Sequence, residues 1–176
     1  MAAGANRQMT IFGGHWEPIL IAAGCATLVA GAGGAVSTIG PWYKSLRKPT
    51  WQPPNWLFGP AWTLIFALIT AAGVIGWEAT PNAESAAWLL SLFGINAIAN
   101  FAWSYLFFSR RRPDWALFDI APLWLSILAL IVTLAFLAKL AALLLLPYLL
   151  WVSFAGYLNY VIVRLNAPFG ASTEGR

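Results

Sequence analysis

The stretch that decides the fold is WYKSLRKPTWQPPNWLFGPAWT, residues 42–63, which lies between two long apolar runs. It combines four tryptophans and four prolines with the cations Lys44, Arg47 and Lys48. Tryptophans and cations of this kind concentrate where a membrane-spanning segment meets water. So much flat aromatic surface beside positive charge indicates a segment that holds something flat, apolar and anionic at the edge of a bilayer.

The composition of the whole chain is that of an integral membrane protein. Of its 176 residues, 60% are hydrophobic and 9% are charged, with a mean hydropathy of +0.71, whereas about 25% of residues are charged in a soluble domain. A span needs about 20 apolar residues to cross about 30 Å of hydrocarbon. Five uncharged runs meet this length, and none shows the alternation of barrel strands.

The predicted fold is therefore an all-α membrane protein, a bundle of five transmembrane helices. We expect one domain over residues 1–176, with residues 40–55 forming a loop over one end. The predicted spans are, in order, about 18–39, 56–76, 85–109, 116–138 and 140–164.

The charges of the connecting loops predict the topology. Residues 40–55 and 110–112 each contain three cations, whereas residues 78–84 contain two acids and the last hairpin contains Lys139. Because cytoplasmic loops are enriched in Lys and Arg, we expect the N-terminus outside and the C-terminus inside. A cleaved signal peptide is the alternative for the first run, but the apolar core of such a peptide has only about 7–15 residues.

The reactive side chains argue against several classes of function. Cys25 is the only cysteine and His15 the only histidine, and neither belongs to a metal-ligand spacing or a nucleophile–base pair. We therefore expect no metal and no required cofactor. The cations flank membrane spans rather than a soluble face, which favours lipid headgroups or an anionic ligand over nucleic acid as the partner.

Small residues recur at every fourth position of the first span, at Ala22, Ala26, Ala30 and Gly34. Such a stripe lets helices approach closely in lipid. Packing within the bundle is the favoured interpretation. A homodimer contact or the thin wall of a ligand cavity remain the alternatives.

Two other spans place amides and aromatic rings on one helix face. Interhelical hydrogen bonds, worth about 0.6 kcal/mol each, explain the amides without a ligand. A cavity explains them as well, because Ala155, Gly156 and the kink expected at Pro147 leave room in the bundle. The residues at this spacing are Asn96, Asn100, Trp103 and Phe107 in the third span, and Trp151, Ala155, Leu158 and Asn159 in the fifth.

Asp119 is the one acid just inside a span. An acid at this depth is a functional candidate. However, the arginines at 110–112 and Arg164 should lie on the same side of the membrane, and the start of a helix favours an acid. We therefore predict a structural ion pair for Asp119.

These residues together resemble the translocator protein / tryptophan-rich sensory protein (TspO/MBR) family, once called peripheral benzodiazepine receptors. The similarity extends in order over about residues 18–166. The matching residues are Trp42, Tyr43, Leu46, Lys48, Pro49, Trp51, Pro53, Pro54, Phe58, Trp62 and Thr63, then Asn100, Trp103, Phe107, Phe108, Arg110, Trp115, Ala116, Leu117 and Asp119, and finally PYLLWVSFAGYLNY from Pro147.

The resemblance implies a receptor, usually dimeric, for porphyrins such as protoporphyrin IX and haem, for sterols and for benzodiazepine-type drugs, with a role in tetrapyrrole transport, regulation or stress sensing. Residues 40–55 would be the pocket lid, and Lys44, Arg47 and Lys48 would contact the porphyrin propionates. The pocket residues implied are Tyr43, Trp51, Trp62, Asn100, Trp103, Trp151 and Ala155.

Two alternatives follow from the same resemblance. A light-dependent porphyrin-degrading enzyme would use Trp62 and Trp151. The other alternative is a lipid or sterol transporter, and the family also has a sterol motif. That motif falls on Leu158, Tyr160 and Arg164, but Gly156 and Tyr157 replace the small threonines of animal members. The resemblance places the protein in a bacterial cell membrane, or in the mitochondrial outer membrane if it is eukaryotic.

Overall fold

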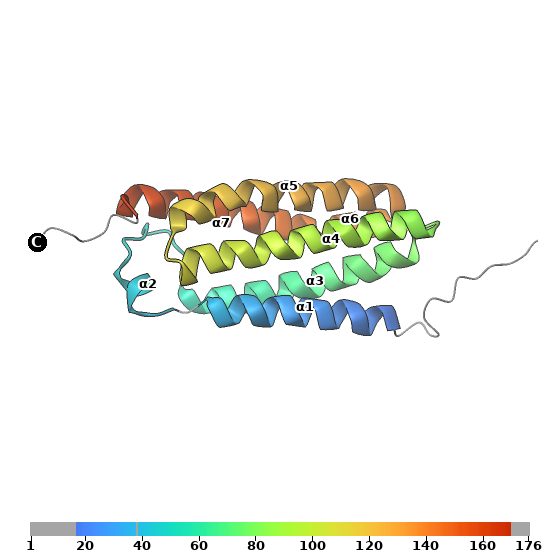
Figure 1. Ribbon diagram of the computed structural model, residues 1–176, viewed down its shortest axis with the longest axis horizontal. Coiled ribbons are helices and arrows are strands. Elements are labelled where there is room, and N and C mark those ends of the chain that lie inside the picture. Colours follow the sequence, from blue (N-terminus) through green and yellow to red (C-terminus); the bar gives the residue numbers. More distant parts are fainter. Residues whose placement is uncertain (1–16, 38, 170–176) are drawn as a thin grey trace, which may run out of the picture.

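The computed structural model describes residues 17–37 and 39–169, and within these ranges all regular structure is helical. Most of the helices run side by side along one axis (Figure 1). The elements are α1 (Glu17–Val36), the short α2 (Pro41–Ser45), the 3-10 turn η1 (Asn55–Leu57), α3 (Phe58–Glu78), α4 (Ala83–Ser104), the π-helical turn η2 (Tyr105–Ser109), α5 (Pro113–Leu137), α6 (Lys139–Leu144) and α7 (Leu146–Asn166).

Five segments are long and apolar enough to cross a membrane, which confirms the predicted fold class. They are Ile19–Val36, Asn55–Glu78, Ala83–Ser109, Pro113–Leu137 and Lys139–Asn166. The orientation of the termini stays a prediction, and His15 lies outside the described residues.

Local sequence explains where several helices begin and end. Asn82 caps α4, since its side-chain oxygen accepts a hydrogen bond from the Ser85 backbone N–H at 2.8 Å. α5 begins with Pro113, whose missing N–H costs nothing in the first turn. The fifth span is divided into α6 and α7 at Leu145, two residues before Pro147. The helix is therefore interrupted next to this proline, where a kink was expected.

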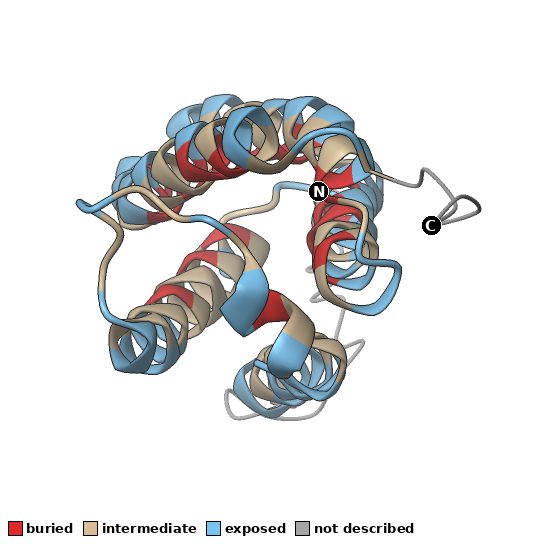
Figure 2. Cartoon of the chain, turned by 90° about the vertical axis from the view of Figure 1, so that its left-hand side faces the viewer, coloured by how far each residue is buried: buried red, intermediate tan, exposed pale blue. Residues whose placement is uncertain are grey.

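The helices form a closed bundle around the long axis. α5 packs against α4 on one side and against α6 and α7 on the other, while α1 packs against α3 and α4. An end-on view shows α2 and its flanking loop crossing the end of the bundle (Figure 2). The same end carries the last turn of α7 (Figure 1).

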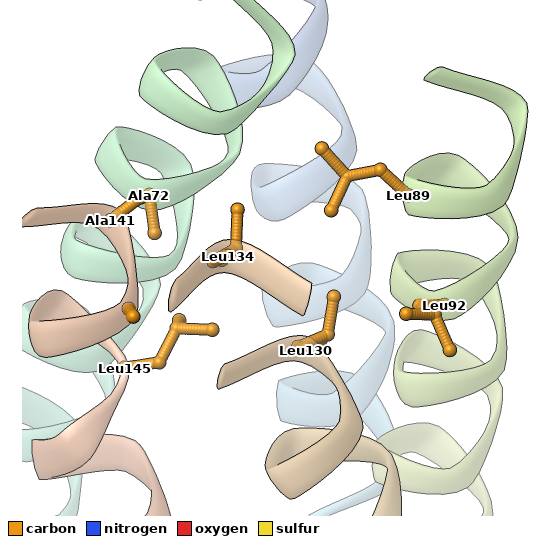
Figure 3. Packing of buried hydrophobic residues seen from close by; sticks show 8 residues of the cluster. Ala72, Leu89, Leu92, Leu130, Leu134, Ala141 and Leu145 are labelled. Atoms are coloured by element: carbon orange, nitrogen blue, oxygen red, sulfur yellow. The ribbon is translucent and has the colours of Figure 1, made fainter. Parts of the chain in front are cut away.

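One core cluster of buried residues lies at the opposite end, away from α2. Leucines of α4, α5 and the α6–α7 junction meet small residues of α3 and α6 there, as Figure 3 shows for Ala72, Leu89, Leu134, Ala141 and Leu145. Gly76 of α3 lies beside this cluster, and a Cβ atom at that position would overlap Cδ2 of Leu134. This end is therefore filled with side chains, which leaves the space in the bundle at the end nearer α2.

Candidate ligand cavity

A cavity of about 990 Å³ lies between α1, α3, α4 and α7, with η2 and Tyr43 of α2 contributing to its wall. This volume is at the upper end of the range for small-molecule sites, about 300–1,000 Å³. Neither α5 nor α6 contributes to the wall. The cavity is therefore the space that the tight core at the other end of the bundle leaves open.

Aromatic rings form one side of the cavity. Trp62 of α3 and Trp151 of α7 meet nearly perpendicular, with ring centroids 6.5 Å apart. Phe58 contacts the Trp151 ring edge-on at 5.7 Å, and Trp103 and Phe107 lie 5.4 Å apart on the α4 side. Each pair lies within the 4.5–7 Å range typical of aromatic contacts. The result is a set of flat walls contributed by three helices.

A chain of buried hydrogen bonds crosses the bundle beside the cavity. The Asn100 amide donates to the Tyr148 hydroxyl at 3.0 Å, and that hydroxyl donates to Oδ1 of Asn96 at 3.3 Å. The Asn96 amide donates to Oγ of Ser126 at 2.9 Å. The two asparagines thus link α4 to α7 and α5, as the packing interpretation expects. Asn100 also lines the cavity, so both interpretations of these amides hold.

Two further polar side chains in the cavity wall have unused hydrogen-bonding capacity. Nε1 of Trp103 and both amide atoms of Asn159 are buried, and they have no partner among the residues that the structure describes. Asn159 is only 1% exposed. Buried polar groups are nearly always hydrogen-bonded. These two side chains are therefore the polar groups of the wall that remain to be satisfied.

The first span supplies small residues to the wall, including three of the four stripe residues but not Ala22. Ala26, Ala30 and Gly34 all line the cavity, as do Ala23 and Gly33. The small-residue stripe thus lies where the alternative interpretation, a thin cavity wall, placed it. The same helix packs against α3 and α4, so the favoured packing interpretation also holds.

The segment over the end of the bundle is organised around Tyr43. Its side chain is 6% exposed, and Nζ of Lys48 lies 3.8 Å from its ring centroid. Gln52 donates to the Tyr43 hydroxyl, which donates to Oδ1 of Asn55, both at 3.4 Å. Burial raises the pKa of Tyr43 and lowers the pKa of Lys48. At neutral pH Tyr43 is thus a neutral donor that faces the cavity.

Two contacts fasten this segment to α7. The backbone N–H of Arg47 donates to Oδ1 of Asn166, and the Asn166 amide donates back to the Arg47 carbonyl, both at 2.8 Å. The Trp51 ring stacks on Tyr157 with centroids 5.4 Å apart and planes 13° apart. We call residues 40–55 the lid, because they close the end of the bundle above the cavity.

Comparison with known proteins identifies the family of the chain. The sequence model of the TspO/MBR family matches residues 19–165. The chain belongs to the TspO/MBR family. Tryptophan-rich protein TspO of Chlorobaculum tepidum is 41% identical over 157 residues, covering 85% of this chain and 98% of that protein. Protein CrtK of Rhodobacter capsulatus is 40% identical, with 80% and 88% covered, and human translocator protein is 37% identical, with 71% and 75% covered.

The structure brings most of the expected pocket residues of this TspO/MBR-family protein together. Six of the seven line the cavity, namely Tyr43, Trp62, Asn100, Trp103, Trp151 and Ala155. Trp51 does not, because its ring lies on the outer side of α7 against Tyr157 and Phe154. Of the sterol motif, Leu158 lines the cavity, whereas Tyr160 and Arg164 are exposed and contact each other.

Lys44, Arg47 and Lys48 lie on the lid but not in the cavity wall. The ion pair predicted for Asp119 is wrong: Arg112 instead pairs with Asp114, two residues along the chain, through both side-chain oxygens. Oδ2 of Asp119 is buried without a partner among the described residues. Asp114 and Arg112 lie together at the start of α5, so their side chains can meet. Asp119 lies more than one turn further into the helix, away from Arg112.

Two residues important for the site match the family pattern but were not predicted as pocket residues. Phe58 lies one turn before Trp62 on α3, and Tyr148 lies three residues before Trp151 on α7. Helical spacing places each on the face of its tryptophan. That spacing is the feature of the sequence that could have identified them. The role of the Tyr148 hydroxyl follows only from its hydrogen bonds to Asn96 and Asn100 in the structure.

Proposed function

We propose that this protein is a membrane receptor that binds porphyrins, such as protoporphyrin IX and haem, in the cavity between α1, α3, α4 and α7. The observation that carries the proposal is the cavity of about 990 Å³ with tryptophan walls on three helices. Sterols and benzodiazepine-type drugs are further apolar candidates for the same space. Such a receptor would act in tetrapyrrole transport, regulation or stress sensing.

The physical basis is stacking combined with charge. Each ring that stacks on the porphyrin face contributes about 0.5–1.5 kcal/mol beyond the burial of apolar area. The two propionates would extend toward the lid, where Lys44 and Arg47 are exposed and offer charge-assisted hydrogen bonds. The prolines of the lid reduce the entropy lost when it closes over a ligand. The bound porphyrin requires no metal or cofactor from the protein.

The test is a titration of protoporphyrin IX into the detergent-solubilised protein, followed by the porphyrin absorption band. Porphyrin absorbance is preferable to protein fluorescence, because the variants remove tryptophans. Trp151→Ala should weaken binding at least tenfold, which is about 1.4 kcal/mol. Trp88→Ala is the matched control, since Trp88 is exposed on α4 and lies outside the cavity. Equal affinities in the two variants would eliminate the stacking proposal.

A light-dependent porphyrin-degrading activity is the second candidate. It is supported by the Trp62 and Trp151 rings, which line the same cavity with centroids 6.5 Å apart. The measurement is loss of the porphyrin band on illumination in air. The double variant Trp62→Phe, Trp151→Phe should still bind porphyrin through its rings but stop the loss. Continued loss at the wild-type rate would leave binding as the function.

A further inference from the structure

A second hollow lies on the outer side of the bundle, along the seam between α3 and α7. Its volume is about 510 Å³. Each helix contributes residues at helical spacing, so each set lies on one helix face. We call this hollow the seam groove. Its helical walls consist of Ala61, Leu64 and Ile65 of α3, and Pro147, Leu150, Trp151 and Phe154 of α7.

The seam groove faces the hydrocarbon of the membrane. Leu64 is 60% and Leu150 69% exposed, and both lie within membrane-spanning segments. Every residue of its walls is apolar. Within a span, such a surface contacts lipid tails rather than water. The apolar walls of the groove therefore favour binding of a hydrocarbon chain.

The dimensions of the groove fit part of one chain. From Pro147 to Phe154 the helix rises about 10 Å, which is roughly a third of the 30 Å hydrocarbon core. Helices in lipid associate through close packing, because lipid tails are as apolar as leucine. A gap in that packing loses dispersion contacts on both sides. A chain lying along the seam restores those contacts.

Two side chains with hydrogen-bonding groups lie at the lid end of the groove. Pro53 lines this end, and Phe154 meets the Trp51 ring edge-on at 6.0 Å. Trp51 and Tyr157, which stack on each other, are both exposed. Indole N–H and phenol hydroxyl groups are typical of the headgroup level of a membrane. A lipid whose tail lies in the groove would thus place its ester region beside two hydrogen-bonding side chains.

We propose that the seam groove is a second binding site, which holds one acyl chain of a membrane phospholipid with its ester region at Trp51 and Tyr157. Trp151 lines both the seam groove and the internal cavity. Its ring is therefore the wall between the bound lipid and the cavity. The inference goes beyond the proposed receptor function and does not depend on which ligand the cavity takes.

The experiment fills the seam groove from α3. Delipidated protein is titrated with palmitoyl-oleoyl phosphatidylcholine in detergent, and bound lipid is counted by native mass spectrometry. The wild type should show a discrete first adduct, and Ala61→Phe should weaken it at least tenfold. Ala135→Phe is the matched control, because Ala135 is exposed on α5 and lines neither hollow. It should keep the wild-type adduct.

A second groove variant keeps the proposal testable if Ala61→Phe does not fold. Leu150→Trp fills the seam groove from α7 at an exposed position, and far-UV circular dichroism shows which variants keep the helices. Loss of the adduct in either folded groove variant, with retention in Ala135→Phe, supports the site. The proposal is overturned if the folded groove variants bind lipid as the wild type does. It is equally overturned if the wild type shows no discrete first adduct.

Discussion

At the residue scale, two glycines of α3 differ in what surrounds them. A Cβ atom at Gly76 would overlap Cδ2 of the fully buried Leu134 and approach Cδ2 of Leu89 to 3.3 Å. A Cβ atom at Gly73 would meet only the Phe93 ring, at an ordinary 3.7 Å. The side chains of Leu134 and Leu89 therefore fill the space that a Cβ atom would need at Gly76, whereas that space is free at Gly73.

The two glycines give opposite predictions on substitution. Gly76→Ala should lower stability by about 1–3 kcal/mol, the usual cost of overpacking. Gly73→Ala should be neutral or raise stability by up to about 1 kcal/mol, because alanine is the better helix former. Thermal unfolding in detergent measures both. A wild-type transition for Gly76→Ala would show that Leu134 moves freely, contrary to its full burial.

A second residue-scale prediction concerns the hydroxyl of Tyr148. Tyr148→Phe keeps the buried ring but removes the partner of the Asn100 amide and of Oδ1 of Asn96. Interhelical polar contacts in membranes are worth about 0.6 kcal/mol on average and up to about 1.7, so we expect a loss of about 1–2 kcal/mol. Tyr105→Phe, at an exposed position, is the control. Equal transitions for the two variants would contradict the role given to this network.

At the element scale, the sequence predicts the helices well and the lid poorly. The length of the apolar runs defines the five spans, and Pro147 lies next to the break between α6 and α7. The side on which the Trp51 ring lies could not be predicted, because it depends on how the proline-rich lid folds back over the bundle. The partner of Arg112 is Asp114 rather than Asp119, a choice that depends on side-chain reach. Periodicity identifies faces, whereas contacts between distant segments need the fold.

The Asn166 contact is such a long-range feature, and it yields a prediction. Asn166→Ala removes two hydrogen bonds to the Arg47 backbone, each worth about 0.5–1.5 kcal/mol. Amide hydrogen exchange in residues 46–52 should therefore speed up at least fivefold, as measured by mass spectrometry.

Asn82→Ala is the matched control, because it removes the N-cap of α4 in the turn between α3 and α4. It should cost about 1 kcal/mol of stability and leave exchange in the lid unchanged. If both variants changed lid exchange equally, the effect would be global destabilisation rather than release of the lid.

At the scale of the whole molecule, charge divides the bundle into two unlike ends. The lid end carries Lys44, Arg47 and Lys48, the arginines at 110–112 and Arg164, whereas the other end carries Glu78, Glu84 and Lys139. Because positive loops are retained in the cytoplasm, the lid end should face inward. The lid and the cavity beneath it would then lie toward the cytoplasmic side, where an anionic ligand would meet the lid cations first.

Cysteine labelling tests this orientation. In a Cys25→Ala background, Asn82→Cys places a thiol in the α3–α4 turn, and Thr50→Cys places one in the lid, both at exposed positions. A membrane-impermeant maleimide should label Asn82→Cys in intact spheroplasts and Thr50→Cys only after permeabilisation. The reverse pattern would invert the topology. The lid cations would then face away from the cytoplasm, and the ligand of the cavity would have to be sought on the outer side of the membrane.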